Sequence, residues 1–200
     1  TYPLLSFILE RQGTPAWLIG ANAATMAVGL IVSAPLIPGL AIRFGAARLA
    51  LACALALAVL FAVIATWQSL SVWFPARFLL GVAINGLYIS SETWVNQMAP
   101  DRIRGRLLGF YATSLAGGFA LGPAILALTG TQTLTPFLLC IGVAFVCAGL
   151  IWSIRERLPR FASGDSGSIR QVAPLIPFLL AVTGIAAAFD QAILTMFPVY

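Results

Sequence analysis

Long apolar runs dominate the chain and are separated by short polar segments. The runs are about twenty residues long, the length that a helix needs to cross a bilayer. They lack the alternation of apolar and polar residues that is typical of membrane β-strands. In lipid such a run must satisfy its own backbone hydrogen bonds, so it forms a helix. The pattern predicts helices over residues 16–37, 49–67, 72–98, 107–128 and 136–154, with the end of an earlier helix before residue 11 and the start of another from residue 172.

Composition supports a membrane protein. Of the 200 residues, 60% are hydrophobic and 8% are charged, whereas a soluble domain carries about 25% charged residues. A water-soluble fold of this length could not bury so much apolar surface, so most of it faces lipid or other helices. We therefore expect an all-α polytopic membrane protein.

The basic residues indicate the orientation in the membrane. All eleven are arginine, and all but Arg77 lie outside the predicted helices, in short segments rather than in a basic cluster, which argues against a nucleic-acid partner. Nine fall on one side of the predicted helices: Arg43, Arg48, Arg102, Arg104, Arg106, Arg155, Arg157, Arg160 and Arg170. The positive-inside rule places that side, with segments 38–48, 99–106 and 155–171, in the cytoplasm.

The sequence offers little for catalysis or metal binding. It contains no histidine, and Cys53, Cys140 and Cys147 all lie inside apolar runs, as small buried hydrophobic residues do. An intramembrane enzyme would need a nucleophile with its base, or a set of metal ligands. We predict neither an enzyme nor a bound metal or cofactor.

A polar stripe runs along the predicted helix 72–98. At about 100° per residue its members fall within a sector roughly 100° wide. They are Arg77, Gly81, Asn85, Tyr88, Glu92 and Asn96. An ionised group facing lipid costs at least a few kcal/mol, so the stripe is expected to face protein or a water-filled cavity.

Two interpretations stay open for the charged members of the stripe. Arg77 and Glu92 are roughly 22 Å apart along the helix and cannot pair with each other. Each is either a tether to another helix or part of a cavity or coupling site. A carboxyl group in a low-dielectric site readily holds a proton, as a proton carrier must. Asn22 is either a helix–helix hydrogen-bonding group or a cavity residue, and Asp190 is expected near the outer surface in solvent.

Four segments together resemble the major facilitator superfamily. The stretch "RFLLGVAINGLY" contains Arg77-x-x-x-Gly81 and is similar to the helix-four motif of that superfamily. The stretch "GGFALGP", with Gly118, Gly122 and Pro123, is similar to the helix-five motif of its antiporters. The loop "APDRIRGRLLGFYATS", with Arg104, Gly105 and Arg106, and the loop "GLAIRFGAAR" resemble two further family loops, in the same order.

The match to these motifs is incomplete. In the loop between the second and third helices, Leu40, Ala41, Arg43 and Gly45 match the family pattern G-x-L-A-D-R-x-G. Pro38 replaces its first glycine and Ile42 replaces its aspartate, which puts a charge-paired lock of one conformation in doubt. The helix-five motif usually continues into two glycines, where this chain has Leu126 and Ala127, and this weakens the inference of antiport.

The matching residues also have a physical interpretation that does not depend on the family. Gly118 and Gly122 lie one turn apart and would allow a neighbouring backbone to approach. Pro123 removes a backbone donor and permits a bend. Arg104 and Arg106 either contact lipid phosphates or helix C-termini, or only set the topology.

The resemblance implies a major facilitator-type bundle, truncated to about half of a twelve-helix transporter. Residues 1–154 would form the N-terminal bundle, residues 155–171 a cytoplasmic linker and residues 172–200 helix seven. The resemblance further implies a location in the bacterial inner membrane and a complete protein that is monomeric. Within the superfamily, the chain resembles a poorly characterised bacterial subgroup that handles drugs or metabolites. Such a protein moves a small molecule by alternating access between two bundles.

In this interpretation the substrate and coupling residues lie on helices two and four. Asn22, Asn85, Tyr88 and Glu92 would line the substrate cavity, and Arg77 and Glu92 would serve charge pairing or coupling. Proton-coupled export is the mode that we expect. The alternative is a membrane sensor or receptor of the same fold that transports nothing.

Overall fold

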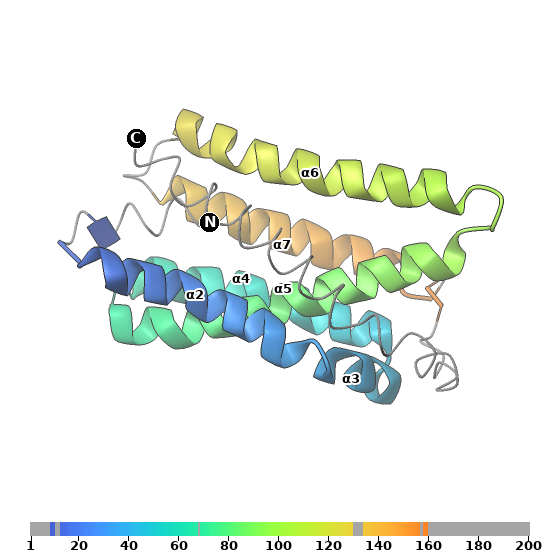
Figure 1. The fold of residues 1–200 in the computed structure, drawn as a ribbon, viewed down its shortest axis with the longest axis horizontal. Coiled ribbons are helices and arrows are strands. Elements are labelled where there is room, and N and C mark those ends of the chain that lie inside the picture. The colour runs from blue at the N-terminus through green and yellow to red at the C-terminus, as the bar shows by residue number, and fades with distance from the viewer. Residues whose placement is uncertain (1–8, 11–12, 68, 130–133, 157, 160–200) are drawn as a thin grey trace, which may run out of the picture.

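The computed structural model describes residues 9–10, 13–67, 69–129, 134–156 and 158–159. Every regular element in this part of the chain is a helix (Figure 1). The helices are α2 (Ala16–Ser33), α3 (Leu36–Phe44), α4 (Ala46–Thr66), α5 (Leu70–Met98), α6 (Arg104–Thr129) and α7 (Thr135–Ile154). The predicted all-α class is therefore confirmed. Most of the predicted linker (residues 157 and 160–171), the predicted helix from residue 172 and Asp190 lie outside the described residues.

Four of the described helices, α2, α4, α5 and α7, are long and apolar enough to cross a membrane. Most helix ends fall within three residues of their predicted positions, because the apolar runs that fill a bilayer also set the helix lengths. That α6 also crosses the membrane remains a prediction from the sequence.

One predicted helix and the loop after it were wrong. Residues 16–37 do not form a single helix, because α2 ends at Ser33 and α3 starts at Leu36. Pro35 between them has no N–H with which to continue the hydrogen-bond ladder. Residues 38–48, predicted as a loop, are helical except at Gly45, whose φ of 90° favours glycine. Pro38 lies in the first turn of α3, where a missing N–H costs no helical hydrogen bond.

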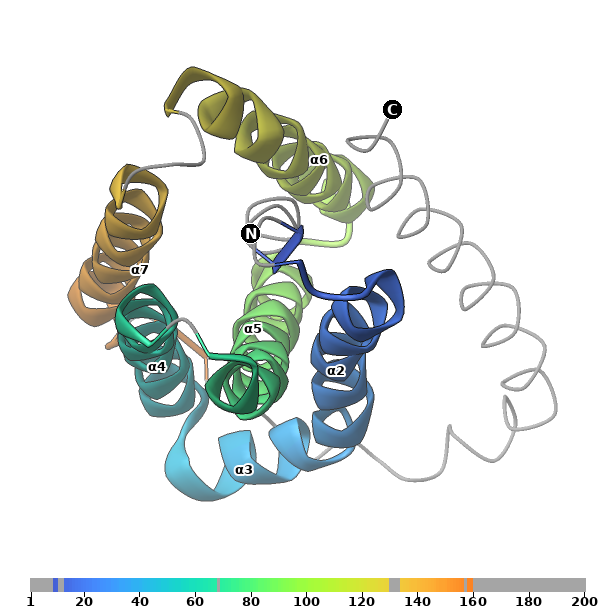
Figure 2. The same cartoon turned by 90° about the vertical axis from the view of Figure 1, so that its left-hand side faces the viewer.

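Helix α5 lies at the centre of the described bundle, as the end-on view in Figure 2 shows. It packs against α2 on one side and α4 on the other, and α7 packs against α4. One core cluster contains large buried apolar side chains from three of these helices: Trp73 and Leu80 on α5, Phe61 and Ile64 on α4, and Phe137 on α7. Close packing of these side chains against one another holds α4, α5 and α7 together.

Helices α2 and α5 run parallel and touch through two glycines. A Cβ atom placed on Gly29 would overlap the backbone carbonyl of Phe78, and one placed on Gly81 would overlap the backbone carbonyl of Met26. Each glycine therefore lets the opposite backbone come closer than any other residue could. This contact fixes the register of the two helices and brings Asn85 opposite the end of α2.

Helix α6 is the least buried of the six. Apart from Leu108, Tyr111 and Leu115, every α6 side chain that the structure describes is exposed. These three residues share one face, at spacings of three and four. That face points toward the bundle, so α6 contacts the rest of the described chain along a narrow stripe.

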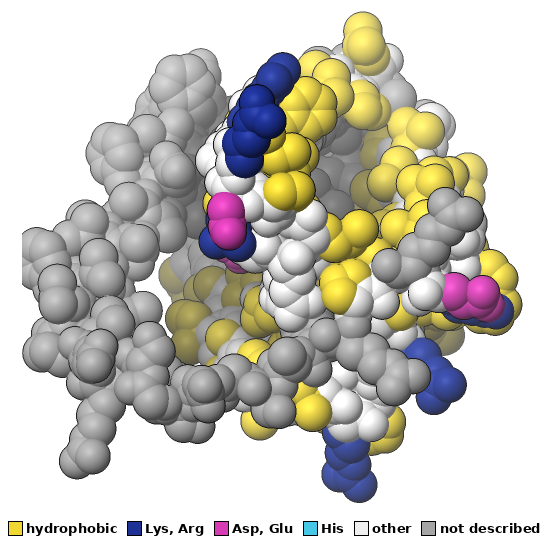
Figure 3. All heavy atoms as spheres, turned by 90° about the vertical axis from the view of Figure 1, so that its right-hand side faces the viewer, with side chains coloured by type: hydrophobic (Ala, Val, Ile, Leu, Met, Phe, Trp, Pro, Cys, Tyr) yellow, Lys and Arg dark blue, Asp and Glu magenta, His cyan; other side chains and the backbone are white. Residues whose placement is uncertain are grey.

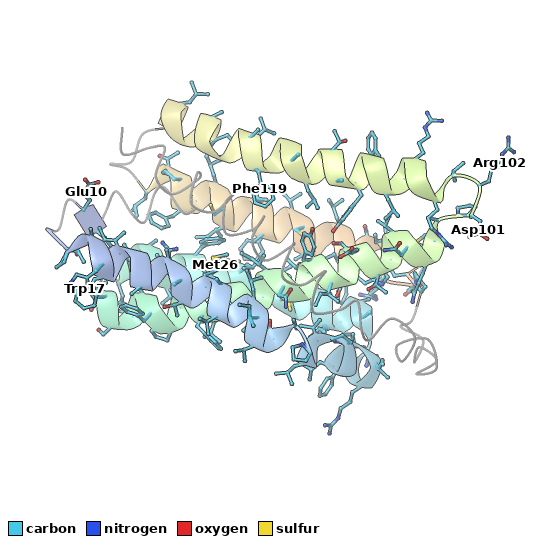
Figure 4. All side chains as sticks on the ribbon, in the orientation of Figure 1. Glu10, Trp17, Met26, Asp101, Arg102 and Phe119 are labelled. Atoms are coloured by element: carbon cyan, nitrogen blue, oxygen red, sulfur yellow. The ribbon has the colours of Figure 1, made fainter. Side chains whose placement is uncertain are left out.

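The arginines gather at one end of the bundle. Six of the seven in the described part of the chain lie where α3, α5 and α7 end and where α4 and α6 begin (Figure 3). They are Arg43, Arg48, Arg102, Arg104, Arg106 and Arg155. Figure 4 shows Asp101 and Arg102 at this end and Glu10 and Trp17 at the opposite end. The one-sided charge distribution matches the predicted orientation, although the compartment that it faces remains a prediction.

Replacing Gly81 by alanine should lower the free energy of unfolding by about 1–3 kcal/mol, the cost of an overpacked contact. The new methyl group would meet the carbonyl of Met26, which belongs to the backbone and cannot rotate away. Gly118→Ala is the matched control, because a Cβ there would have no neighbour within 4 Å. Thermal unfolding in detergent compares the two variants. Equal melting temperatures would contradict the proposed close contact.

Candidate functional site

The polar stripe of α5 is divided between two environments at Asn85. On one side of this point Arg77 is 2% exposed and Asn85 itself 8%. On the other side Tyr88 is 43% exposed, and Glu92 and Asn96 are exposed as well. The cause is the end of α2 at Ser33, since beyond this level α2 no longer covers α5. The sequence predicted one continuous stripe and could not show this division.

Asn85 joins α5 to the end of α2. Its Nδ2 donates to the carbonyl oxygen of Leu30 at 3.0 Å and to the hydroxyl oxygen of Ser33 at 2.9 Å. The Ser33 hydroxyl in turn donates to the same Leu30 carbonyl at 3.2 Å, and the Ala34 N–H donates to it at 3.1 Å. The sequence placed Asn85 in a substrate cavity, which stays a prediction. In this structure its amide group holds α2 where α2 breaks.

Asn22 is completely buried, and its amide group is unsatisfied among the described residues. Its exposed fraction is 0%, and neither amide atom has a hydrogen-bond partner in this part of the chain. The helix–helix hydrogen bond that the sequence allowed for Asn22 is therefore not formed among the described residues. Met26 lies against Gly81, and the two helices are parallel. Asn22 precedes Met26 by one helical turn, as Arg77 precedes Gly81, so Asn22 and Arg77 lie at the same level. Two buried polar side chains thus lie at the same depth between α2 and α5.

Tyr88 lies beside α6, where two further polar residues join it, and Glu92 lies one turn further along α5. The rings of Tyr88 and Tyr111 have centroids 6.4 Å apart and planes tilted by 58°. The hydroxyl groups of Ser91 and Tyr111 are 2.9 Å apart and hydrogen-bonded. The sequence predicted roles for Tyr88 and Glu92 but missed Ser91 and Tyr111. Residue spacing could not find them, since the contact depends on how α6 folds back beside α5.

The residues of the two arginine-bearing motifs line the same end of the bundle. Leu40 and Arg43 are exposed on α3, and the Arg43 guanidinium lies 5.4 Å from the centre of the Phe44 ring. Gly45 provides the turn into α4. The predicted loop 99–106 is shorter than expected, because α6 already begins at Arg104.

Arg104 is paired with Asp101 at the start of α6. It forms a salt bridge of 2.8 Å with Asp101, three residues before it. Gly105 and Arg106 are exposed in the same turn. Functional roles for these motif residues remain predictions.

The glycines of α6 face open space. A Cβ on Gly118 or Gly122 would have no neighbour within 4 Å, so the close backbone approach expected there is not formed with the described residues. α6 is continuous through position 123 and ends at Thr129. The predicted helix bending at Pro123 is not tested by this structure.

Comparison with known proteins agrees with this architecture. The family model of the Major Facilitator Superfamily matches residues 1–200. The chain is also 31% identical over 145 residues to an uncharacterized MFS-type transporter, YfkF, of Bacillus subtilis (strain 168), with 70% of this chain and 37% of that protein covered. The matched part thus spans little more than a third of this relative's length. The chain belongs to the major facilitator superfamily, as its motifs indicated.

Removing the amide of Asn85 should destabilise the protein by roughly 0.6 kcal/mol and by at most about 1.7 kcal/mol, the average and the maximum for hydrogen bonds between membrane helices. Asn85→Ala breaks the bonds to Leu30 and Ser33. Asn96→Ala is the control on the same helix, since among the described residues the Asn96 amide bonds only the Glu92 carbonyl one turn back. Thermal or denaturant unfolding measures both. An Asn85→Ala variant as stable as Asn96→Ala would show that this clamp is dispensable.

Asn22→Ala is expected to leave stability unchanged or to raise it, unlike Asn85→Ala. A buried polar group without a partner costs about 1–3 kcal/mol, and removing it offsets the small cavity that is left. Unfolding of the purified variant in detergent measures the effect. A drop in stability as large as that of Asn85→Ala would mean that the Asn22 amide has a stabilising partner.

Proposed function

We propose that the polypeptide containing this chain is a secondary transporter that moves a small molecule by alternating access, in proton-coupled export. Membership in the major facilitator superfamily supports transport in general. The relative in Bacillus subtilis is itself named as an MFS-type transporter. Export and proton coupling are our additions and are supported by the placement of Glu92.

The exposed carboxylate on α5 is the observation that carries this proposal. Glu92 lies six residues before the end of α5, or about 9 Å along the helix axis. A helix of 29 residues is roughly 43 Å long, against an apolar bilayer thickness of about 30 Å. Glu92 thus lies close to the boundary of the apolar layer, on the side of the arginines. An exposed acid at that depth requires water or a polar partner.

We propose separate roles for the buried and the exposed polar residues of α5. Arg77 and Asn22 lie at one depth, buried between α2 and α5. Arg77 is proposed for charge pairing in coupling, and Asn22 is proposed as a cavity residue. Asn85 lies between them and the exposed group formed by Tyr88 and Glu92. Glu92, which water can reach from the arginine-bearing end, is the proposed proton carrier. Substrate would meet Tyr88 and Glu92 first from that side.

Glu92→Gln should abolish proton coupling, because an amide cannot take up a proton at physiological pH. The complete polypeptide encoded by the gene is reconstituted into proteoliposomes with a pH-sensitive dye inside. Tetraphenylphosphonium, salicylate and a mixture of neutral amino acids serve as probes. Coupled flux should fall on the order of tenfold or more, as when a proton-transfer group is removed. Glu156→Gln, an exposed acid after α7, is the control and should behave as wild type.

A different result would contradict each part of the proposal: the role of Glu92, proton coupling and transport itself. Coupled flux at the wild-type rate in Glu92→Gln would exclude Glu92 as the essential proton carrier. Flux that is unchanged when the pH gradient is collapsed would exclude proton coupling. Binding of a probe without flux in either direction would favour the sensor or receptor instead.

A further inference from the structure

The place where α5 and α6 meet combines two aromatic rings with one carboxylate. We propose that Tyr88, Tyr111 and Glu92 form a binding subsite for an organic cation, a molecule with one positive charge on an apolar body. This inference rests on the proposed transport function and names the class of substrate that the exposed side of α5 takes.

The aromatic part of the subsite comes from two helices. The Tyr88 and Tyr111 rings lie 6.4 Å apart, centre to centre, at an angle of 58°, so they form an open corner rather than a stack. The face of a tyrosine ring attracts a cation that lies within about 6 Å of its centre. Tyr88 is 43% exposed, so a ligand can reach its ring.

Hydrogen bonds hold the Tyr111 ring in place. The Ser91 hydroxyl donates its hydrogen to the Tyr88 carbonyl at 2.9 Å. The bond of 2.9 Å between Ser91 and Tyr111 must then use the Tyr111 hydroxyl as donor and the Ser91 oxygen as acceptor. The ring of Tyr111 is thereby positioned before any ligand arrives, which reduces the entropy lost on binding. Ser91 is a positioning residue in this subsite.

The charge of the subsite is negative and is not compensated by any salt bridge among the described residues. Glu92 lies one turn after Tyr88 on the same face of α5, where side chains four apart are neighbours. Its carboxylate forms no salt bridge within the part of the chain that the structure describes. Arg104 lies two turns before Tyr111 on the same face of α6, but it is paired with Asp101 at 2.8 Å. A cationic ligand would supply the charge that Glu92 lacks.

These features select against other ligand classes. An anion would be repelled by Glu92 and would find no described cation free at this point. A neutral molecule would gain ring contacts but would leave the carboxylate without a counter-charge. A monovalent organic cation uses both features at once, since its charge faces Glu92 and its apolar groups contact the two rings.

Direct binding tests this inference independently of transport. Radiolabelled tetraphenylphosphonium is titrated against the complete protein purified in detergent. We expect saturable binding that weakens on the order of tenfold in Tyr111→Leu, within the range of a desolvated cation–π contact. Glu92→Gln should weaken binding by a similar factor or more. Phe110→Leu and Glu156→Gln are matched controls, because both are exposed and belong to neither the ring pair nor the carboxylate.

Substitutions that change the ring at position 111 distinguish a role of Tyr111 in binding from a role in packing. Tyr111→Phe keeps the ring and loses only the bond to Ser91, so its affinity should stay within about threefold of wild type. Tyr111→Trp should bind at least as tightly as wild type, because tryptophan attracts cations most strongly. A monodisperse elution profile shows that each variant is folded. This rank order would not arise if Tyr111 only packed α6 against α5.

Two results would overturn the inference. One is equal affinity for tetraphenylphosphonium in wild type, Tyr111→Leu and Glu92→Gln. The other is the absence of saturable binding in a wild-type protein that transports salicylate or amino acids, which would leave the proposed transport function intact. Ring-dependent binding in a protein that transports nothing would instead support the subsite and contradict the proposed transport.

Discussion

The structure depends on one close contact between two parallel helices. Gly29 on α2 and Gly81 on α5 have no side chains, and each accepts a backbone carbonyl of the opposite helix where a Cβ atom would lie. Because membrane helices gain little hydrophobic energy from leaving lipid, close packing of this kind is a main source of their association. The contact fixes the register and places Asn85 beside Leu30 and Ser33.

The end of α2 follows from Pro35 and divides α5 into two parts. Before this level α2 covers α5, and Arg77, Gly81 and Asn85 are buried. After it the chain turns into α3, and Tyr88 and Glu92 are uncovered. A single proline on one helix therefore decides which polar residues of another helix can meet water or a ligand. The proposed substrate and proton chemistry belongs to the uncovered part.

Helix α6 contributes to the site through a narrow contact. Its inward face carries Leu108, Tyr111 and Leu115, and Tyr111 reaches the Ser91 hydroxyl of α5. Further along that face, a Cβ atom placed on Gly118 or Gly122 would have no neighbour within 4 Å among the described residues. The Tyr111–Ser91 bond thus links the two helices that would form the organic-cation subsite. Its donor and acceptor follow from the bond that Ser91 makes with its own helix.

The membrane class, most helix ends and the segregation of arginine could be predicted from the sequence, because bilayer thickness and the cost of charge in lipid act on any local stretch. Four motifs also pointed to the superfamily. The folded arrangement was needed to show that Asn85 bonds the end of α2, that Asn22 is buried without a partner among the described residues, and that Tyr111 contacts Tyr88. These outcomes depend on where α2 breaks and on how two helices approach. A helical period gives the face of a residue, but it does not give the neighbour that covers that face.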